Sequence, residues 1–315
     1  MLFSTPVPLP SADNPIDYDS NIVLLGSCFA NHMAEKFMRL RFRAAVNPFG
    51  ILFQPTALES FVESCLSEKV FTPVDCFEHN GLWHHFQAHS QMDGASATAV
   101  CKSLNDAAKS GGDNIRKATH IFITLGSAWA YRHRESGNLV ANCHKVPQSA
   151  FTKELLSVQR IGESLANTII SINKVNPSAQ VVFTVSPVRH LKDGFVENQR
   201  SKSHLIAAVH QVRERFPVTR YFPAYEIMMD ELRDYRFYAP DMIHPNSVAI
   251  GYIWQRFSQT WIDPQALPTM AEVESILRRM EHRPFNPESK AHLKFTAALQ
   301  ADIAGLTARF AHMRF

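Results

Sequence analysis

Short apolar runs alternate with longer amphipathic stretches along the chain. The runs lie at residues 21–25, 42–46, 120–125, 180–185 and, more briefly, 220–222. A continuous apolar run that stops at a glycine or a turn is typical of a parallel strand buried on both faces. Stretches with apolar residues at helical spacing follow, at residues 29–40, 58–66, 155–169 and 205–212. This repetition predicts an α/β protein with a five-stranded parallel sheet between two layers of helices.

Two segments interrupt the repeat, and a third extends it. Residues 67–95 and 132–150 are long connections rich in His, Asn and aromatic residues, and loops of that length are usually functional or disordered. From about Met270 onward, the apolar spacing predicts two terminal helices. We therefore expect one domain over residues 1–265 with two insertions, and a helical extension over residues 266–315 packed on the same domain.

Composition, net charge and cysteine spacing argue against several classes of protein. With 45% hydrophobic and 19% charged residues, the chain is able to bury a large core. A net charge of +3 is too small to indicate a nucleic-acid or membrane surface, and no apolar run approaches a membrane span of about 20 residues. The N-terminus lacks the pattern of a secretory signal, and five irregularly spaced cysteines argue against a disulfide framework. We expect a cytoplasmic protein with no nucleic-acid or membrane partner.

In parallel sheets the functional loops lie at the carboxyl ends of the strands. Ser27 follows the first strand and precedes a helix, whose N-terminus favours a developing negative charge. A serine that only caps the helix is the alternative interpretation. Cys28 competes as the nucleophile, because a thiolate is activated at a helix start. Adjacent helical residues point roughly 100° apart, so both cannot face one base.

Asp241 and His244 form a DxxHP motif near the end of the α/β repeat. An Asp at this spacing orients one nitrogen of the imidazole and leaves the other free as a general base. With Ser27 they complete a triad in the order Ser, Asp, His. The alternative is a turn with a solvated Asp and a His that caps the next helix.

Six motifs together resemble a known family. They are GSCFA at 26–30, NPFG at 47–50, NCHK at 142–145, SPVRH at 186–190, SK at 201–202 and YEIMMDELRDYRFYAPDMIHP at 225–245. They closely resemble the bacterial GSCFA family, which is similar to the SGNH hydrolases, also called GDSL-like esterases. The resemblance covers about residues 21–257. It implies a three-layer, flavodoxin-like α/β/α fold with strand order 2-1-3-4-5.

The resemblance also implies roles for individual residues. Ser27 matches the nucleophile, with Cys28 packed against the sheet; His244 matches the base and Asp241 its orienter. The backbone N–H groups of Ser27 and Gly50 would then stabilise the oxyanion.

The third sequence block of the SGNH hydrolases is incomplete in this chain. Gly126 matches its glycine, but Ala128 stands where those enzymes place an oxyanion-hole asparagine. An absent donor costs about 3–4 kcal/mol of transition-state stabilisation. Asn142 or Asn47 could supply it from a loop, and spacing does not decide between them.

Four polar residues in the loops are candidates for substrate binding. Arg189 and Lys145 could hold an anionic or hydroxylated group, with His190 and His144 beside them. The alternative is that they stabilise the loops through backbone hydrogen bonds. Ser201-Lys202 is expected to open a helix near the same edge, with no assigned role.

The insertion at residues 67–95 carries a cluster of histidines. They are His79, His84, His85 and His89. Because no carboxylate or thiolate accompanies them at ligand spacing, we expect no metal site, and we expect no cofactor elsewhere. The segment is either a cover over a sugar-like ligand or an ordinary packed insertion.

Taken together, the sequence predicts a serine esterase of the SGNH type. Its substrate would be a small-molecule or glycan ester, with an O-acyl group such as acetyl on a carbohydrate. The rival hypothesis is a binding or scaffold protein that keeps the fold without turnover.

Overall fold

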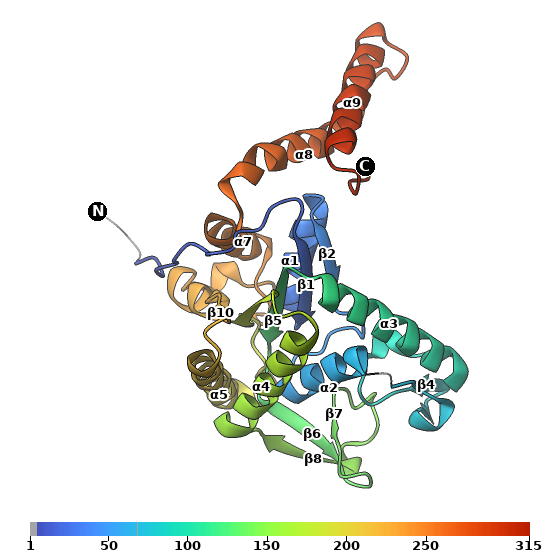
Figure 1. Ribbon diagram of the computed structural model, residues 1–315, viewed down its shortest axis with the longest axis vertical. Helices are drawn as coiled ribbons and strands as arrows, with labels where there is room; N and C mark the ends of the chain where they lie inside the picture. Colours follow the sequence, from blue (N-terminus) through green and yellow to red (C-terminus); the bar gives the residue numbers. More distant parts are fainter. Residues whose placement is uncertain (1–4, 68) are drawn as a thin grey trace.

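The predicted apolar runs pair into a five-stranded parallel sheet in the computed structural model, which describes residues 5–67 and 69–315 (Figure 1). The strands are β1 (Asn21–Gly26), β2 (Arg43–Val46), β5 (His120–Leu125), β9 (Gln180–Val185) and β10 (Arg220–Tyr221). Their spatial order is β2-β1-β5-β9-β10, and all pairings are parallel. Counted along the chain this is the order 2-1-3-4-5, so the predicted fold class is confirmed.

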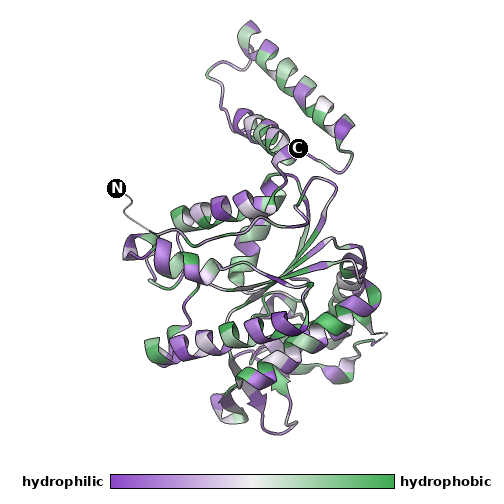
Figure 2. Cartoon of the chain, turned by 60° about the vertical axis from the view of Figure 1, so that its left-hand side comes forward, coloured by the Kyte–Doolittle hydropathy of each residue, from purple (hydrophilic) through white to green (hydrophobic). Residues whose placement is uncertain are grey.

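Helices cover both faces of this sheet, as Figure 2 shows. One face carries α2 (Pro55–Leu66), α3 (Ala97–Lys117), α4 (Val158–Val175) and α5 (Gly194–Arg215); the other carries α1 (Cys28–Arg39) and α7 (Ser247–Trp261). Successive strand side chains point to opposite faces. In β1, Val23 and Leu25 therefore join the core beneath α2, whereas Ile22 and Leu24 join the core beneath α1.

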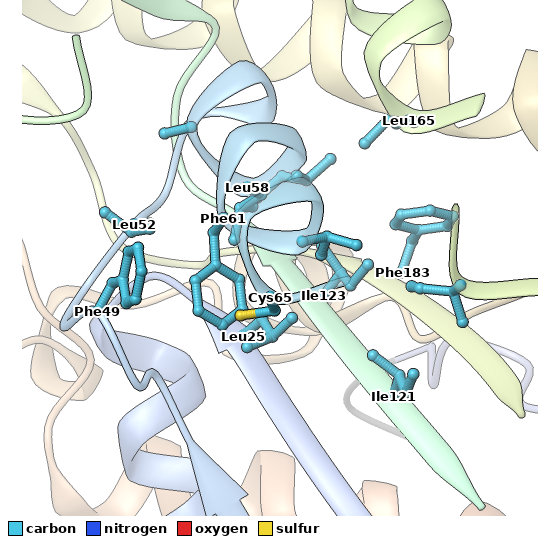
Figure 3. Close-up of a cluster of buried hydrophobic side chains, with 14 of the residues drawn as sticks. Leu25, Phe49, Leu52, Leu58, Phe61, Cys65, Ile121, Ile123, Leu165 and Phe183 are labelled. Atoms are coloured by element: carbon cyan, nitrogen blue, oxygen red, sulfur yellow. The ribbon is translucent and has the colours of Figure 1, made fainter. Parts of the chain in front are cut away.

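The packing of α2 shows how the first core is built. Its Phe61 and Cys65 lie over the sheet close to Leu25 and Ile123 (Figure 3). Phe61 also packs edge-on against Phe49, with ring centroids 5.0 Å apart. Each fully buried side chain of this size contributes roughly 1.5–3 kcal/mol. The core therefore fixes the turn after β2, to which Phe49 belongs.

The helix α3 was not predicted from the sequence. It contains Gly111 and Gly112, and glycine lowers helix propensity by about 1 kcal/mol per residue. The reason for glycine is tertiary: a Cβ on Gly112 would lie 2.3 Å from the Cys65 carbonyl oxygen of α2. Two helices that pack this closely require a residue without a side chain at the contact.

Both insertions contain strands, so the expectation of long loops was wrong. Residues 67–95 include a hairpin, β3 (Phe77–His79) with β4 (Leu82–His84). The second insertion belongs to a small antiparallel sheet of β6 (Trp129–His133), β7 (Leu139–Val140) and β8 (Phe151–Leu155). Leu155 pairs with Trp129 in this sheet instead of opening the next helix, which begins after the cap Ser157. Strands of two to five residues give too short a pattern to detect.

The chain ends in the two expected helices, α8 (Leu267–Met280) and α9 (Lys290–Arg309), which extend away from the sheet (Figure 1). A short helix, α6 (Ala224–Glu226), and a π-helical turn over Ile227–Glu231 precede α7. After α9 the chain returns to the domain, where Phe310 lies 5.1 Å from the Tyr18 ring and His312 bonds to the Arg41 carbonyl. Within the described ranges, the helices are all too short or too polar to cross a membrane.

Candidate active site

The turn between β1 and α1 presents two neighbouring nucleophile candidates. Ser27 is the N-cap of α1, and its Oγ accepts a hydrogen bond from the Phe29 N–H at 3.3 Å. Its own N–H donates to the Thr124 carbonyl of β5 at 3.1 Å. With 1% of its surface exposed, Ser27 therefore serves as the helix cap that was the alternative interpretation.

Cys28 is the first residue of α1 and is only half-buried, so it is not packed into the sheet core as expected. Burial raises the pKa of the Cys28 thiol. The backbone N–H groups at the helix start act to lower that pKa, as does the nearby Lys202 charge, while Asp241 acts to raise it. The Cys28 thiol therefore lies at the N-terminus of α1, within the electrostatic influence of Lys202 and Asp241.

The DxxHP motif forms a closed hydrogen-bonded loop ahead of α7. His244 Nδ1 lies 2.7 Å from Asp241 Oδ2, and Asp241 Oδ1 accepts the backbone N–H groups of Ile243 and His244. These bonds lower the pKa of Asp241 to about 2. One carboxylate thus makes the turn and also orients the imidazole. His244 does not cap the next helix, because Asn246 is the N-cap of α7, so that part of the alternative interpretation was wrong. Among the residues that the structure describes, no hydrogen bond joins His244 to Ser27 or Cys28.

The backbone donors predicted for the oxyanion hole already have acceptors inside the protein. The Gly50 N–H donates to the Asn47 carbonyl at 2.8 Å, and the Gly126 N–H donates to the Phe53 carbonyl at 2.7 Å. The Ser27 N–H is also engaged, by Thr124, as described above. These bonds correct the expectation that the Ser27 and Gly50 N–H groups face a developing oxyanion, and they leave the Gly126 N–H equally engaged.

The two asparagines considered as replacement donors hold backbone turns. Asn47 Oδ1 accepts the Gly26 N–H at 2.8 Å, and its Nδ2 donates to Asn31 Oδ1 at 2.7 Å. Asn142 Oδ1 accepts the His144 N–H at 2.8 Å. Asn47 therefore supports the nucleophile turn, and Asn142 supports the loop that carries His144.

His190 has the environment of a neutral hydrogen-bonding group. Its Nε2 is buried without a hydrogen-bond partner in the described part of the chain, and a Cβ on Gly126 would lie 3.1 Å from it. Burial lowers the pKa of His190 to about 3, with further lowering by Lys202 and His244. The ring is thus neutral at pH 7, and its Nε2 lies beside the loop that follows β5.

Lys202 ties together two loops at the carboxyl edge of the sheet. Its fully buried Nζ donates to the carbonyls of Gly126 and Ser186, both at 2.7 Å, while Ser201 Oγ accepts the Ala128 N–H at 2.8 Å. The pair lies inside α5, which begins at Gly194, and does not open a helix. A sequence signal was present: Lys202 precedes the buried Leu205 by three residues, which puts a lysine on the apolar face of the helix.

The buried ammonium of Lys202 predicts a pH-dependent stability. Burial lowers its pKa to about 7, so between pH 7 and about 10.4 the unfolded chain binds more protons than the folded one. Relative to Lys202→Met, the free energy of unfolding of the wild type should rise across this range by up to about 1.4 kcal/mol per pH unit. Urea unfolding of both proteins from pH 7 to pH 9 measures this difference; parallel pH profiles would contradict it.

Of the predicted binding residues, Arg189 has a clear structural role. Its guanidinium lies 3.9 Å from the centre of the Tyr238 ring, its Nη1 donates to the Met242 carbonyl, and its N–H donates to the Ile243 carbonyl. It therefore holds the loop that carries Asp241 and His244, as the loop-stabilising alternative proposed. Lys145 is exposed, and His144 is buried in the insertions beside His84 and Asp93.

Comparisons with known proteins identify the family of this chain. The sequence matches the GSCFA family over residues 21–257 and the C-terminal domain of GSCFA domain proteins over residues 273–315. Curated proteins gave no match. Among solved structures, an acetyl xylan esterase (Est2A) from the rumen bacterium Butyrivibrio proteoclasticus is 10% identical, with a TM-score of 0.32. The match covers 67% of this chain and 57% of the esterase, so this chain spans less than two thirds of that protein. The family match extends over most of the sequence, and the chain belongs to the GSCFA family.

Proposed function

We propose that this protein hydrolyses carboxylic esters by nucleophilic acyl transfer, with His244 as general base and Asp241 as its orienter. The observation that supports the proposal most is the 2.7 Å contact between His244 Nδ1 and Asp241 Oδ2. It assigns the ring proton to Nδ1 and leaves Nε2 unprotonated for proton transfer. His244 is 42% exposed at its side chain, so substrate can reach it.

Three observations favour Cys28 over Ser27 as the nucleophile. Cys28 is half-buried, whereas Ser27 is 1% exposed. The Ser27 hydroxyl already caps the helix by accepting the Phe29 N–H, whereas the Cys28 thiol makes no such cap bond in the described part of the chain. The Cys28 N–H has no backbone acceptor among the described residues, whereas the Ser27 N–H is engaged by Thr124. Only Cys28 therefore combines an accessible nucleophile with an available N–H of its own.

The proposed reaction uses these groups in turn. His244 Nε2 takes the thiol proton as Cys28 Sγ attacks the ester carbonyl, and the oxyanion accepts a hydrogen bond from the Cys28 N–H. We assign the second donor to His190, in the neutral tautomer that carries its proton on Nε2, with bound substrate providing the acceptor that this buried nitrogen lacks. Collapse breaks the bond to the alcohol, which leaves with the proton from His244. Water, deprotonated by His244, then attacks the thioester and releases the acid and the free thiol. His190 here supplies the side-chain donor that Ala128 cannot.

Ser27 remains the competing nucleophile, because the resemblance to SGNH hydrolases assigns it that role. The substrate class, a short acyl ester such as acetyl on a carbohydrate, also comes from that resemblance. Assays with acetyl esters test the substrate class in the wild type, and the same assays on variants of Ser27 and Cys28 test which residue is the nucleophile.

The proposal is tested by turnover of p-nitrophenyl acetate and an O-acetylated polysaccharide by the full chain. His244→Ala should lose nearly all activity, and His190→Ala should lower kcat by about 10²–10³-fold, the cost of one oxyanion donor. His133→Ala, an imidazole in the small antiparallel sheet, is the matched control and should retain full activity. A folded wild type that neither turns over esters nor is modified by iodoacetamide or a fluorophosphonate would support the scaffold hypothesis instead.

A further inference from the structure

Three metal-ligating side chains converge in the two insertions, outside the residues of the proposed reaction. Asp93 Oδ1 lies 2.9 Å from His84 Nδ1 and 3.1 Å from His144 Nδ1, and the three atoms lie within 4.8 Å of one another. His84 is in β4, Asp93 follows the turn Ser90–Met92, and His144 is in the loop after β7. The tertiary structure thus supplies the carboxylate that we did not expect beside the histidines.

The hydrogen bonds on the far side of each ring determine which nitrogen carries the proton. His84 Nε2 faces the His79 carbonyl at 2.9 Å, and His144 Nε2 faces the His85 carbonyl at 3.0 Å. A carbonyl oxygen only accepts, so in both neutral rings Nε2 carries the proton and Nδ1 presents a lone pair. This arrangement is the second layer of hydrogen bonds typical of metal-bound histidines.

Three lone-pair donors therefore point toward one another in a buried space. The side chains of His84, His144 and Asp93 are 5%, 0% and 11% exposed, and the three converging atoms have no hydrogen-bond partner among the described residues. Two imidazolium rings on one carboxylate would leave a net buried charge, which is costly. A divalent cation between the three atoms satisfies all of them.

We propose that His84, Asp93 and His144 bind a divalent transition-metal ion, with Zn²⁺ as the fitting species. Tetrahedral ligands at the usual Zn²⁺ distances lie about 3.3 Å apart, close to the two contacts with Asp93. Imidazole nitrogen suits zinc and its neighbours, whereas Mg²⁺ and Ca²⁺ take oxygen ligands. With three protein ligands, a water molecule completes the coordination.

The metal would join the insertions to the edge that carries the active site. Gly94, beside Asp93, exchanges two backbone hydrogen bonds with Trp83 of the hairpin. The His89 N–H donates to the Phe49 carbonyl in the turn after β2. His144 has a φ of +48°, a conformation that costs a non-glycine residue energy and indicates that its position is imposed. The ion would therefore fix the shape of the insertions beside the active site.

The test is zinc binding by the full chain, measured without reference to activity. After EDTA treatment and dialysis, calorimetric titration with ZnCl₂ should give one ion per chain, and zinc should raise the Tm. Asp93→Asn, which preserves shape, and His144→Ala should each weaken zinc binding by at least about 100-fold. His133→Ala is the matched histidine control and should bind zinc as the wild type does.

Two results would overturn the zinc-site proposal. One is a folded wild type, checked by circular dichroism, that binds no Zn²⁺, and the other is an unchanged Zn²⁺ affinity in Asp93→Asn. If His144→Ala fails to fold, the isosteric Asp93→Asn variant still decides the question. Co²⁺ in place of zinc should give the visible absorption of a four-coordinate site in the wild type and should lose it in Asp93→Asn.

Discussion

Cys28→Ala should reduce ester hydrolysis by about 10⁴-fold or more, because it removes the atom that attacks the carbonyl. Ser27→Ala should instead keep most of the turnover and lower the free energy of unfolding by about 1 kcal/mol, the value of a lost helix cap. The measurements are kcat/KM on p-nitrophenyl acetate and urea unfolding of both variants. Intact-mass analysis after iodoacetamide treatment should show one adduct fewer in Cys28→Ala than in the wild type, a comparison that is needed because Cys76 and Cys143 are also half-buried.

Two further variants control for local damage. Cys28→Ser preserves the size of the side chain and shows whether lost activity reflects chemistry or packing. Ser27→Gly keeps an acceptable cap and should cost only a few tenths of a kcal/mol. The reverse result, with activity lost in Ser27→Ala and retained in Cys28→Ala, would restore the serine mechanism that the sequence predicted.

Gly26→Ala should destabilise the protein by about 3 kcal/mol or more. Gly26 has a φ of +128°, and a Cβ there would lie 2.1 Å from the Thr124 carbonyl oxygen of β5. Neither the backbone angle nor the adjoining strand is free to change, since the Ser27 N–H bonds to that same oxygen. The measurement is urea unfolding of the wild type and the variant.

Gly137→Ala is the matched control for this substitution. Gly137 also has a positive φ, of +68°, but its Cβ would meet open space. It should therefore cost only the backbone strain, about 1–2 kcal/mol. Equal losses in the two variants would contradict the argument that close contact between β1 and β5 requires Gly26.

The main elements followed from local pattern, and the exceptions have tertiary causes. Strands buried on both faces give continuous apolar runs, which is why β1, β5 and β9 were predicted correctly. The helix α3 was missed because the contact with α2 favours glycine where helix propensity disfavours it. The strands of the insertions were missed because each is only two to five residues long, which is too short a pattern to detect, and β6 and β8 pair only across the intervening residues 134–150.

The features of the candidate site are likewise of two kinds, those that the sequence predicted and those that depend on the tertiary structure. The sequence by itself determined the fold class, the position of the Ser27-Cys28 turn and the bond between Asp241 and His244, because these depend on neighbouring residues. Long-range contacts decided the rest: which N–H groups lack acceptors, why His190 is neutral, where Lys202 is buried, and how Asp93 meets His84 and His144. Burial and hydrogen-bond pairing depend on segments that are distant in sequence, so spacing along the chain does not reveal them.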